Sequence, residues 1–502
     1  MNALASRLRV WHVLALAFAA RFAVGLSTDS VLQPDEVMQY LEQAHRLVFG
    51  PGMIPWEYDY GTRSWVAPLF IAGILEPLRL MGLGAPQIYQ PVVKAVLCAV
   101  SLAVPYSAYR ISRTLFSEAA AWLALLFTAF WYELVSYGHR STIDALGAYP
   151  ALGALALVFA EPRLRVTASC GALAGLACVL RNQLGPAVAV IGLIAIWRWR
   201  WRVWPAAVAG ALVVLAGGAL DAYTWGFWFA SAITSFDFNV GQNQMVRFGT
   251  QPFHWYAIVL AVLSGGLAPI GAIGLLMSWR RSWPLIAVAL VTALTFSALA
   301  HKETRFIFLL TPLWLMGLAA LVADGGQLLA DTVPRLRRVA PAGAMLLIAG
   351  TLVASVFGLS NRLPRENRYV RSHIARVQTR EAYRAVAAEP DVTAVLDASA
   401  TDSSSPWYLT PFYDLHHDVP LYWPLSNGFN DVRSNPRPYA SHVIAPAADG
   451  APNGYRAVKR VGSLMIWRRI SDPPESRVPR GYDRRIAALQ PIKAEPIVTP
   501  RW

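Results

Sequence analysis

The sequence contains few charged residues and very few cysteines. Only 15% of its 502 residues are Asp, Glu, Lys or Arg, whereas 55% are hydrophobic. This composition excludes an ordinary soluble protein and predicts a polytopic membrane protein. The three cysteines, Cys98, Cys170 and Cys178, all lie inside apolar runs, where a thiol behaves as a small hydrophobic group. We therefore expect neither a disulfide framework nor a thiol-ligated metal site.

Lysine is also scarce, since only four of the 44 basic residues are lysines. This arginine-rich and alanine-rich composition suggests a bacterial member with a GC-rich genome. The net charge of +14 would suit a nucleic-acid-binding protein. However, the basic residues cluster in short segments between apolar runs, a pattern that sets the orientation of membrane proteins. Nucleic acid is therefore not an expected partner.

Eleven apolar stretches are long enough to cross a bilayer as helices. They are approximately residues 10–27, 91–109, 118–136, 143–160, 167–181, 183–198, 204–220, 253–277, 284–300, 306–324 and 339–358. The first follows two arginines, as a signal peptide would, but it has no convincing cleavage site and is interpreted as an uncleaved span. Residues 64–83 are apolar but contain Pro68, Glu76 and Pro77. This stretch is expected to be an interfacial or re-entrant helix.

The positions of the arginines predict which segments face the cytoplasm. With the N-terminus inside, the arginine clusters between spans all fall on the cytoplasmic side, as the positive-inside rule requires. The same alternation places residues 28–90, 137–142, 221–252, 301–305 and everything after 359 outside. This predicted alternation depends most on residues 167–198, where Arg181 and Pro186 divide two short spans, because losing one crossing there would invert every later segment.

Hydropathy falls after Ser360, which predicts a second domain. Residues 360–470 contain short strand-like pieces at 392–396, 442–445 and 463–468, between loops rich in Pro, Asp and Ser. They are expected to form a small soluble extracytoplasmic α/β module. Residues 471–502 are rich in Pro and Arg and are expected to be poorly ordered.

Two acidic residues, Asp35 and Glu36, follow the first span. Pro34 precedes them at the expected start of an amphipathic helix, and the spacing of Asp35, Gln39 and Glu42 puts them on one helical face. Proline and acidic residues are also common in the first turn of any helix, so an ordinary helix start is the alternative. The other polar motifs favour a functional site.

A second polar motif, His301-Lys302-Glu303-Thr304-Arg305, separates two long apolar runs. Ionisable groups at a membrane boundary are costly unless they have a function. The positive charge of His301, Lys302 and Arg305 fits a phosphate or pyrophosphate group. Snorkelling at the end of a span is the alternative, but the orientation rule makes basic residues on the outer side exceptional.

Aromatic and polar residues mix in two further outer segments. Trp56 and Glu57 precede Arg63 in the first loop, and such a mixture suits a sugar, which stacks through its C–H faces and hydrogen bonds through its hydroxyls. An interfacial aromatic belt is the alternative, but it leaves Glu57 and Arg63 unexplained. In the loop at 221–252 and the start of the next span, Asn239 and His254 are candidates, although a lone interfacial histidine is usually structural.

These motifs together resemble glycosyltransferase family 22, the dolichyl-phosphate-mannose-dependent mannosyltransferases of GPI-anchor and N-glycan assembly. The similarity runs in order over roughly residues 10–325, and its motifs are Pro34-Asp35-Glu36 with Gln39 and Glu42, Trp56-Glu57, Arg63-Ser64, Asp221, Trp225-Gly226, Phe238-Asn239, His254-Trp255-Tyr256 and the segment from His301 to Phe306. Two positions depart from the family pattern. Gln33 replaces a histidine before Pro34, and Asp144 replaces an asparagine in a motif that begins at Arg140.

The resemblance implies an all-α GT-C glycosyltransferase domain over residues 1–359, with catalytic outer loops at 28–90, 221–252 and 301–305. It implies transfer of a hexose, mannose by family precedent, from a polyprenyl-phosphate donor to a glycan or glycolipid acceptor, with inversion. Asp35 is then the expected general base and Glu36 its helper. The expected ligands of the donor phosphate are Lys302, Arg305, His301 and Arg63. The expected sugar and acceptor contacts are Gln39, Trp56, Glu57, Asn239, His254 and Glu303.

No cofactor or metal is expected, because a lipid phosphate is already an activated leaving group. The expected location is the plasma (inner) membrane, with the site on its extracytoplasmic face. A transporter or flippase for a polyprenyl-linked glycan is the alternative, but it should show an internal repeat and ionisable groups near the middle of the bilayer. An accessory subunit without activity is a third interpretation, and Asp35 and Glu36 argue against it.

Overall fold

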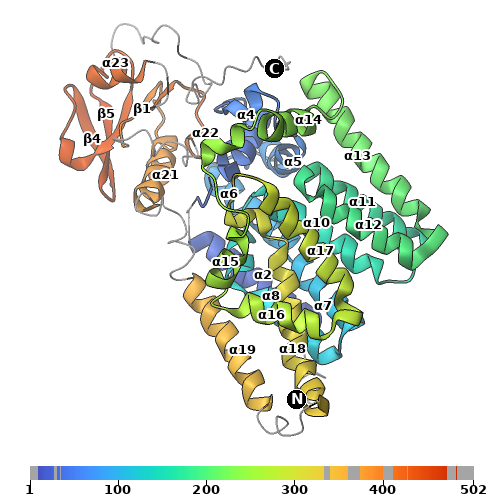
Figure 1. Cartoon of the computed structure of the whole chain (residues 1–502). Coiled ribbons are helices and arrows are strands. Elements are labelled where there is room, and N and C mark those ends of the chain that lie inside the picture. The colour runs from blue at the N-terminus through green and yellow to red at the C-terminus, as the bar shows by residue number, and fades with distance from the viewer. Residues whose placement is uncertain are drawn as a thin grey trace. The chain divides into compact units, whose positions relative to one another are not determined.

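The computed structural model describes residues 9–27, 31–33, 35–332, 340–359, 373–399, 411–424, 426, 428–471 and 482. The chain forms two compact units (Figure 1). The first, here called the helical unit, comprises Met1–Gly25, Lys94–Leu220 and Ser235–Pro364. The second, here called the mixed unit, comprises Leu26–Val93, Asp221–Thr234 and Arg365–Trp502. The predicted boundary at residue 360 lies outside the described residues, as does the tail at 471–502 apart from Ser471 and Tyr482.

All the predicted spans are helical. In chain order the helices are α2 (Val10–Ser27), α6 (Pro86–Ser101), α7 (Ala103–Leu115), α8 (Glu118–Phe130), α9 (Tyr132–Tyr137), α10 (Ile143–Val158), α11 (Leu164–Leu180), α12 (Gly185–Trp199), α13 (Trp204–Trp225), α14 (Ala230–Phe236), α15 (Trp255–Leu263), α16 (Leu267–Met277), α17 (Trp279–Ala298), α18 (Leu310–Thr332) and α19 (Ala340–Phe357). The predicted span at 253–277 is two helices, α15 and α16, bent by 105°. Gly265 and Gly266 make this bend with positive φ angles, which glycine adopts without strain.

Length and hydropathy support only part of the predicted span count. Four helical stretches of the described chain are long and apolar enough to cross a membrane, and the bent pair α15–α16 adds a fifth if it counts as one span. The four stretches are Val10–Ser27, Pro86–Leu115, Asn182–Trp225 and Trp279–Ala298. The remaining predicted spans correspond to apolar helices of 10–17 residues. The count of eleven therefore stays a prediction.

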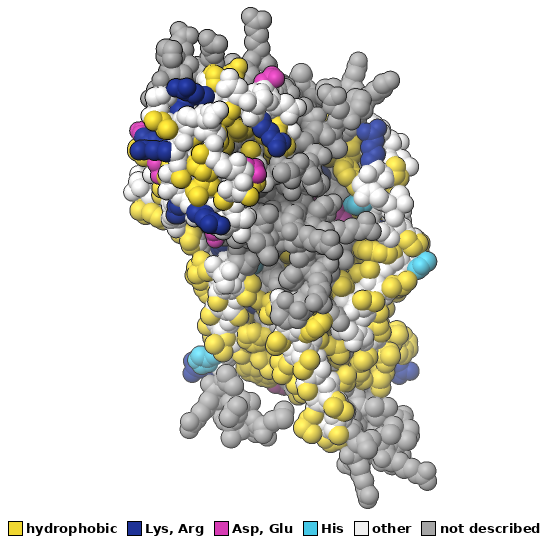
Figure 2. All heavy atoms as spheres, turned by 90° about the vertical axis from the view of Figure 1, so that its left-hand side faces the viewer, with side chains coloured by type: hydrophobic (Ala, Val, Ile, Leu, Met, Phe, Trp, Pro, Cys, Tyr) yellow, Lys and Arg dark blue, Asp and Glu magenta, His cyan; other side chains and the backbone are white. Residues whose placement is uncertain are grey.

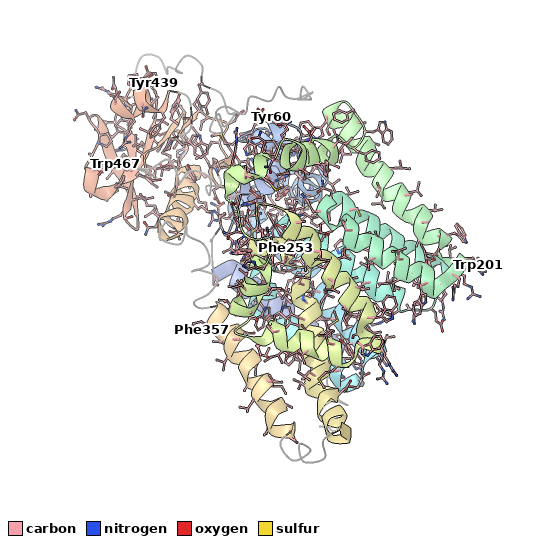
Figure 3. All side chains as sticks on the ribbon, viewed as in Figure 1. Tyr60, Trp201, Phe253, Phe357, Tyr439 and Trp467 are labelled. Carbon is pink, nitrogen blue, oxygen red and sulfur yellow. The ribbon has the colours of Figure 1, made fainter. Side chains whose placement is uncertain are left out.

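The surface and the packing of the helical unit both suit a lipid environment. Hydrophobic side chains dominate the lower part of the face that Figure 2 shows. In α19, the side chains of Leu346 and Val353 are exposed. Trp201, labelled at the right-hand edge of Figure 3, is 75% exposed. Inside the unit, a Cβ on Gly274 of α16 would collide with the carbonyl oxygen of Gly317 on α18. Small residues at such crossings let helix backbones approach closely.

A buried arginine closes the interrupted end of α8. Arg21 of α2 has no exposed surface, and its guanidinium donates hydrogen bonds to the carbonyl oxygens of Ala129 (2.6 Å) and Thr128 (3.2 Å). These carbonyls belong to the last turn of α8, where Trp131 takes an extended conformation and breaks the helix before α9. Carbonyls at a helix end lack intrahelical donors, so Arg21 satisfies groups that the break leaves open.

The mixed unit begins with a π-helical turn, η1 (Glu36–Leu41), followed by α3 (Glu42–Phe49), α4 (Trp56–Asp59) and α5 (Val66–Leu80). Helix α5 confirms that residues 64–83 contain a helix. The C-terminal part of the mixed unit contains three helices and a five-stranded sheet. The helices are α21 (His373–Ala387), α22 (Pro411–Leu415) and α23 (Phe429–Ser434). The strands are β1 (Val395–Asp397), β2 (Leu421–Tyr422), β3 (His442–Pro446), β4 (Tyr455–Val461) and β5 (Leu464–Arg469).

The strand order in this sheet is β2-β1-β3-β5-β4 (Figure 1). Strand β1 pairs in parallel with β2 and β3, whereas β5 pairs antiparallel with β3 and β4. The sequence predicted β3 and β5 closely and placed β1 a few residues early. Strands β2 and β4 were not predicted, because β2 is only two residues long and β4 exposes five consecutive positions.

Candidate active site

The two predicted catalytic carboxylates lie at the start of η1, and the structure gives them different surroundings. Glu36 is buried, and its Oε1 accepts a hydrogen bond of 2.8 Å from the backbone N–H of Leu32. Asp35 is half-buried and its side chain makes no capping hydrogen bond to the helix. A helix does begin at these two residues, as the alternative interpretation of an ordinary helix start requires, but Asp35 does not cap it through its side chain. Pro34 lies outside the described residues.

Gln39 joins two other predicted site residues, Glu57 and Arg63. Its side chain is 1% exposed. Its Nε2 donates to Glu57 Oε1 at 2.7 Å, and its Oε1 accepts from Arg63 Nε at 2.7 Å and from the Tyr40 hydroxyl at 3.1 Å. The structure thus brings these three predicted residues into one polar network. Trp56, on the neighbouring turn, is half-buried and packs edge-on against Tyr60.

Burial raises the pKa of Glu57 to about 7. The positive charge of Arg63 opposes this rise in pKa, whereas the negative charge of Asp35 adds to it. A carboxyl group with such a pKa changes its protonation near neutral pH, a property common in active sites. Sequence analysis named Glu57 as a sugar contact and did not identify it as a titrating group.

The segment at 221–234 supports this network from a distant part of the chain. Trp225 Nε1 donates to the carbonyl oxygen of Arg63 at 3.1 Å, and Thr234 Oγ1 donates to that of Gly61 at 2.6 Å. Asp221 Oδ2 accepts hydrogen bonds from the N–H and the hydroxyl of Ser231, which fixes the turn between them. Two segments that were predicted to lie outside therefore meet within the mixed unit.

In the helical unit, His301, Glu303 and Arg305 form a second polar network. Arg305 donates through Nε to Glu303 Oε2 at 2.9 Å and through Nη2 to Oε1 at 3.1 Å. His301 Nε2 is 3.1 Å from Glu303 Oε1, and its Nδ1 is 3.0 Å from the carbonyl oxygen of Gly249. Both ring nitrogens face acceptor oxygens, an arrangement that favours the protonated imidazole, which has two N–H donors.

The charges of this network shift its pKa values in opposite directions. Burial alone would raise the pKa of Glu303, but Arg305 and His301 outweigh burial and lower this pKa to about 2. Burial would likewise lower the pKa of His301, but its hydrogen bond to Glu303 and the charge of Glu303 raise it. The network therefore holds an ionised Glu303 carboxylate beside Arg305 at neutral pH, and it favours the protonated form of His301.

Sequence analysis did not name Asp144 and Arg181 as site residues, although they complete this network. The Asp144 carboxylate is fully buried and lies 2.9 Å from Arg181 Nη2 and 3.6 Å from Arg305 Nε. Arg181 also lies over the ring of Phe306, 4.8 Å from its centroid. Each is a charged residue at the end of an apolar run. That signal could have identified both.

The remaining predicted residues of the helical unit lie in different settings. The Lys302 ammonium is buried and donates to the backbone carbonyl oxygens of Gln251 (3.0 Å) and Leu299. Asn239 donates to the Ser235 carbonyl oxygen, one turn earlier, at 2.8 Å. His254 is exposed at the N-terminal end of α15. Among the predicted phosphate ligands of this unit, His301 and Arg305 share one network through Glu303.

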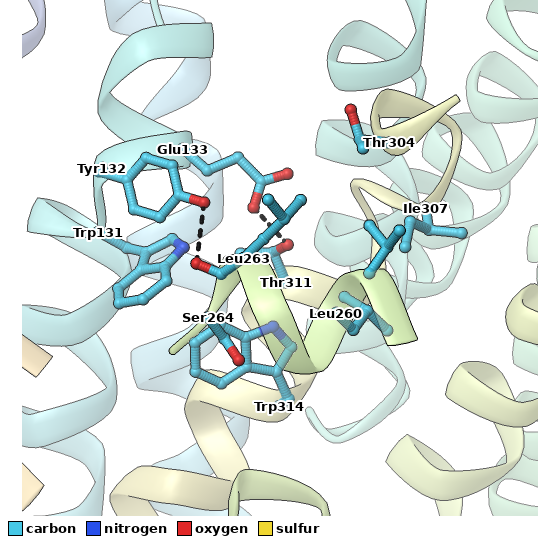
Figure 4. A pocket seen from close by; sticks show the side chains of 11 residues that line it. Trp131, Tyr132, Glu133, Leu260, Leu263, Ser264, Thr304, Ile307, Thr311 and Trp314 are labelled. Carbon is cyan, nitrogen blue, oxygen red and sulfur yellow. Dashed lines mark hydrogen bonds between the residues drawn. The ribbon is translucent and has the colours of Figure 1, made fainter. Parts of the chain in front are cut away.

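A small pocket in the helical unit lies where two predicted spans are interrupted (Figure 4). The Glu133 carboxylate there accepts a hydrogen bond of 2.7 Å from Thr311 Oγ1, and the Tyr132 hydroxyl donates to the Leu263 carbonyl oxygen. Its lining residues are Trp131, Tyr132, Glu133, Val259, Leu260, Leu263, Ser264, Thr304, Ile307, Thr311 and Trp314. None of the predicted site residues lines this pocket. Among the described residues, no three His, Cys, Asp or Glu side chains gather as a metal site would require.

Comparison with known proteins decides the family. Residues 11–412 match the Alg9-like mannosyltransferase family. The chain belongs to this family. It is 30% identical over 426 residues to GPI mannosyltransferase 3 of Yarrowia lipolytica, a match that covers 82% of this chain and 76% of that protein. It is 26% identical over 289 residues to GPI alpha-1,2-mannosyltransferase 3 of Mus musculus, covering 56% of this chain and 53% of that protein.

The fold has a solved counterpart. The crystal structure of ArnT from Cupriavidus metallidurans bound to undecaprenyl phosphate matches with a TM-score of 0.57 and 13% identity, over 91% of this chain and 97% of that chain. These findings confirm the predicted family, the mannosyltransferase activity and a mostly helical GT-C-like fold with a small C-terminal sheet. The protein is an integral membrane enzyme, and the transporter and accessory-subunit alternatives are set aside.

Proposed function

We propose that this Alg9-like mannosyltransferase takes mannose from a polyprenyl-phosphate donor and transfers it to a glycan or glycolipid acceptor. One observation carries the proposal: the Arg305 guanidinium donates two hydrogen bonds to a planar oxyanion, the Glu303 carboxylate. The same fork geometry suits two oxygens of a phosphate. The names of its relatives, GPI mannosyltransferases, and the undecaprenyl phosphate bound to ArnT add support.

In this proposal the donor phosphate takes over contacts that Glu303 makes to Arg305 and His301. As the mannosyl bond breaks, negative charge grows on the departing phosphate, and fixed cations lower the barrier. Arg181 adds positive charge to the same network through Asp144. Lys302 and Arg63 are also proposed phosphate ligands. In the structure Lys302 donates to two backbone carbonyl oxygens, and Arg63 donates to Gln39 and to one backbone carbonyl oxygen.

Asp35 is the proposed general base. The acceptor hydroxyl oxygen forms a bond to the anomeric carbon, while the bond from that carbon to the phosphate oxygen breaks and its electron pair leaves with the phosphate. The hydroxyl proton passes to the Asp35 carboxylate. Because the displacement is direct, the product has inverted configuration. Glu36 is held by Leu32 N–H, which suits the proposed helper role rather than that of a base.

The proposed site faces the extracytoplasmic side of the plasma membrane. Asp144 lies at the outer end of the predicted span at 143–160, Arg181 lies at the outer end of 167–181, and Arg305 directly precedes 306–324. The Asp144 carboxylate is 2.9 Å from Arg181 and 3.6 Å from Arg305. A topology that put one of these ends on the other face would separate them by the thickness of the bilayer. The pairing therefore supports the predicted orientation of the spans at 143–160, 167–181 and 306–324 relative to one another.

The test is transfer by the purified protein in lipid nanodiscs. Radiolabelled polyprenyl-phosphate mannose and a membrane lipid extract should give a labelled glycolipid whose new linkage is α, because the donor is β-linked and the reaction inverts. GDP-mannose and polyprenyl-phosphate glucose are the controls and should give little product. Equal transfer from GDP-mannose would refute the lipid donor. A β-linked product would refute direct displacement.

A further inference from the structure

Glu42 lies nearly two helical turns beyond the proposed catalytic pair, and its carboxylate is completely buried. Its Oε1 accepts hydrogen bonds from the N–H groups of Met53 (2.9 Å) and Phe412 (3.2 Å), and its Oε2 accepts one from Tyr413 N–H (3.0 Å). Phe412 and Tyr413 belong to α22, some 370 residues further along the chain. The side chain thus joins the helix after Asp35 to the C-terminal part of the mixed unit.

Helix α22 is itself held in place by a buried carboxylate. Asp414 accepts from Arg380 Nε at 2.7 Å and from Arg384 Nε at 2.9 Å, both on α21. Its Oδ1 also accepts from Gln90 Nε2 at 2.7 Å, and the Tyr89 hydroxyl donates to the Tyr413 carbonyl oxygen. Five residues could not form a stable helix alone, so these contacts fix where α22 presents its N–H groups to Glu42.

Apolar packing extends the same contact. Met38, on η1, and Met53 are buried in one hydrophobic cluster with residues of α21 and the sheet, including Tyr383, Val395 and Ile466. On the next turn of α3, His45 Nε2 lies 2.9 Å from His416 Nδ1, just after α22. The turn that begins at Asp35 and Glu36 is therefore part of the hydrophobic core of the C-terminal module.

We propose that the C-terminal module, acting through Glu42 and α22, positions the η1–α3 helix and with it the general base Asp35. Glu42 is a positioning residue, and it touches neither donor nor acceptor in this proposal. Helix η1–α3 is short and begins with a π-helical turn, so it needs a tertiary partner to hold one conformation. The inference rests on the proposed function for its catalytic consequence, but the contact itself does not.

The test compares three variants by kinetics and by hydrogen–deuterium exchange of the full-length protein in nanodiscs. Glu42→Gln replaces an acceptor oxygen by an NH₂ group that cannot accept from the α22 amides. Arg384→Gln weakens the support of α22 and leaves Arg380 on Asp414, so it remains informative if Glu42→Gln fails to fold. Lys459→Ala, on an exposed position of β4, is the matched control within the same module.

Glu42→Gln should raise amide exchange in residues 36–49 and 411–415 at least tenfold, because it removes one of the two acceptor oxygens and leaves a buried backbone N–H without a partner. It should lower kcat at least tenfold with little change in the KM for donor. Arg384→Gln should change exchange and kcat in the same direction by less, and Lys459→Ala should change neither.

Two results would overturn the inference. Unchanged exchange in both Glu42→Gln and Arg384→Gln would show that α22 does not hold the helix. Raised exchange with normal kcat would show that holding the helix does not matter for transfer. If the wild-type protein does not use the polyprenyl donor, the proposed function fails, yet the exchange measurement still decides whether the module fixes this helix.

Discussion

Replacing Asp35 by asparagine separates the proposed chemistry from helix stability. Asparagine has nearly the same size as aspartate but does not take up a proton from the acceptor. In the structure the Asp35 side chain makes no capping hydrogen bond, so the substitution removes no cap. Its negative charge also raises the pKa of the buried Glu57, so removing this charge relieves a like-charge repulsion. The folded state should therefore tolerate the change well.

The two interpretations of Asp35 differ widely in the expected effect. Loss of a charge in a first helical turn costs about 0.3–1 kcal/mol of stability, which is within the range of many surface substitutions. Loss of a general base costs about 10²–10⁴-fold in rate. Asp35→Asn should thus insert and melt like the wild type, bind donor with unchanged affinity, and transfer mannose at least a hundredfold more slowly.

The assay measures single-turnover transfer from labelled polyprenyl-phosphate mannose, alongside donor binding and thermal unfolding of the same preparation. Glu36→Gln is the matched comparison, because Glu36 accepts a backbone hydrogen bond from Leu32 and should lose stability as well as rate. Near-normal transfer by Asp35→Asn with a hundredfold loss in Glu36→Gln would move the base to Glu36. Near-normal transfer by both would refute the mechanism.

Four further outcomes are expected. Arg305→Lys keeps the charge but loses the two parallel hydrogen bonds of the guanidinium, so the KM for donor should rise roughly tenfold to a hundredfold. The same change at the exposed Arg247 should leave this KM unchanged. An unchanged KM in Arg305→Lys would mean that the donor phosphate binds elsewhere. Glu57 has a folded pKa of about 7, against 4.5 ordinarily, so the folded state binds its proton more tightly and stability falls as pH rises from about 4.5 to 7. Glu57→Gln should flatten this fall in thermal unfolding between pH 5 and 8, and an unchanged slope would contradict the assignment. Arg21→Leu leaves two buried carbonyls unsatisfied and should cost about 1–3 kcal/mol for each, measured as a lower melting temperature. Transfer should persist in excess EDTA, because the donor phosphate is an activated leaving group, and complete loss that Mg²⁺ restores would show that the reaction needs a metal.

The sequence predicted helices well wherever apolar runs were long, because a run of about 20 apolar residues leaves a membrane-spanning chain few alternatives to a helix. It predicted their interruptions poorly. The run at 253–277 is largely apolar, and the local signals of the bend between α15 and α16 are Ser264-Gly265-Gly266 and Pro269 in the first turn of α16. The break at Trp131 had no local signal, because its open carbonyls are satisfied by Arg21 from a different span.

The site was predictable where its contacts are local and less so where they are distant. Glu303 and Arg305 are two residues apart, and sequence analysis placed them in one motif. Gln39, Glu57 and Arg63 were named as candidates, and the structure joins them in one network that depends on a loop folding back over 24 residues. The role of Lys302 as a phosphate ligand stays a prediction. Its ammonium donates to the backbone carbonyl oxygens of Gln251 and Leu299, a contact that the sequence does not distinguish from phosphate binding.

Asp144 shows how a departure from the family pattern is accommodated. Where the family motif has a neutral asparagine, this chain has a carboxylate with no exposed surface. A buried charge costs several kcal/mol unless it is paired, and here Arg181 lies at 2.9 Å and Arg305 at 3.6 Å. Arg305 therefore lies near two carboxylates, Asp144 and Glu303. If Glu303 gives up its contacts to Arg305 when a phosphate binds, Asp144 still lies 3.6 Å from the Arg305 guanidinium and can hold it in place.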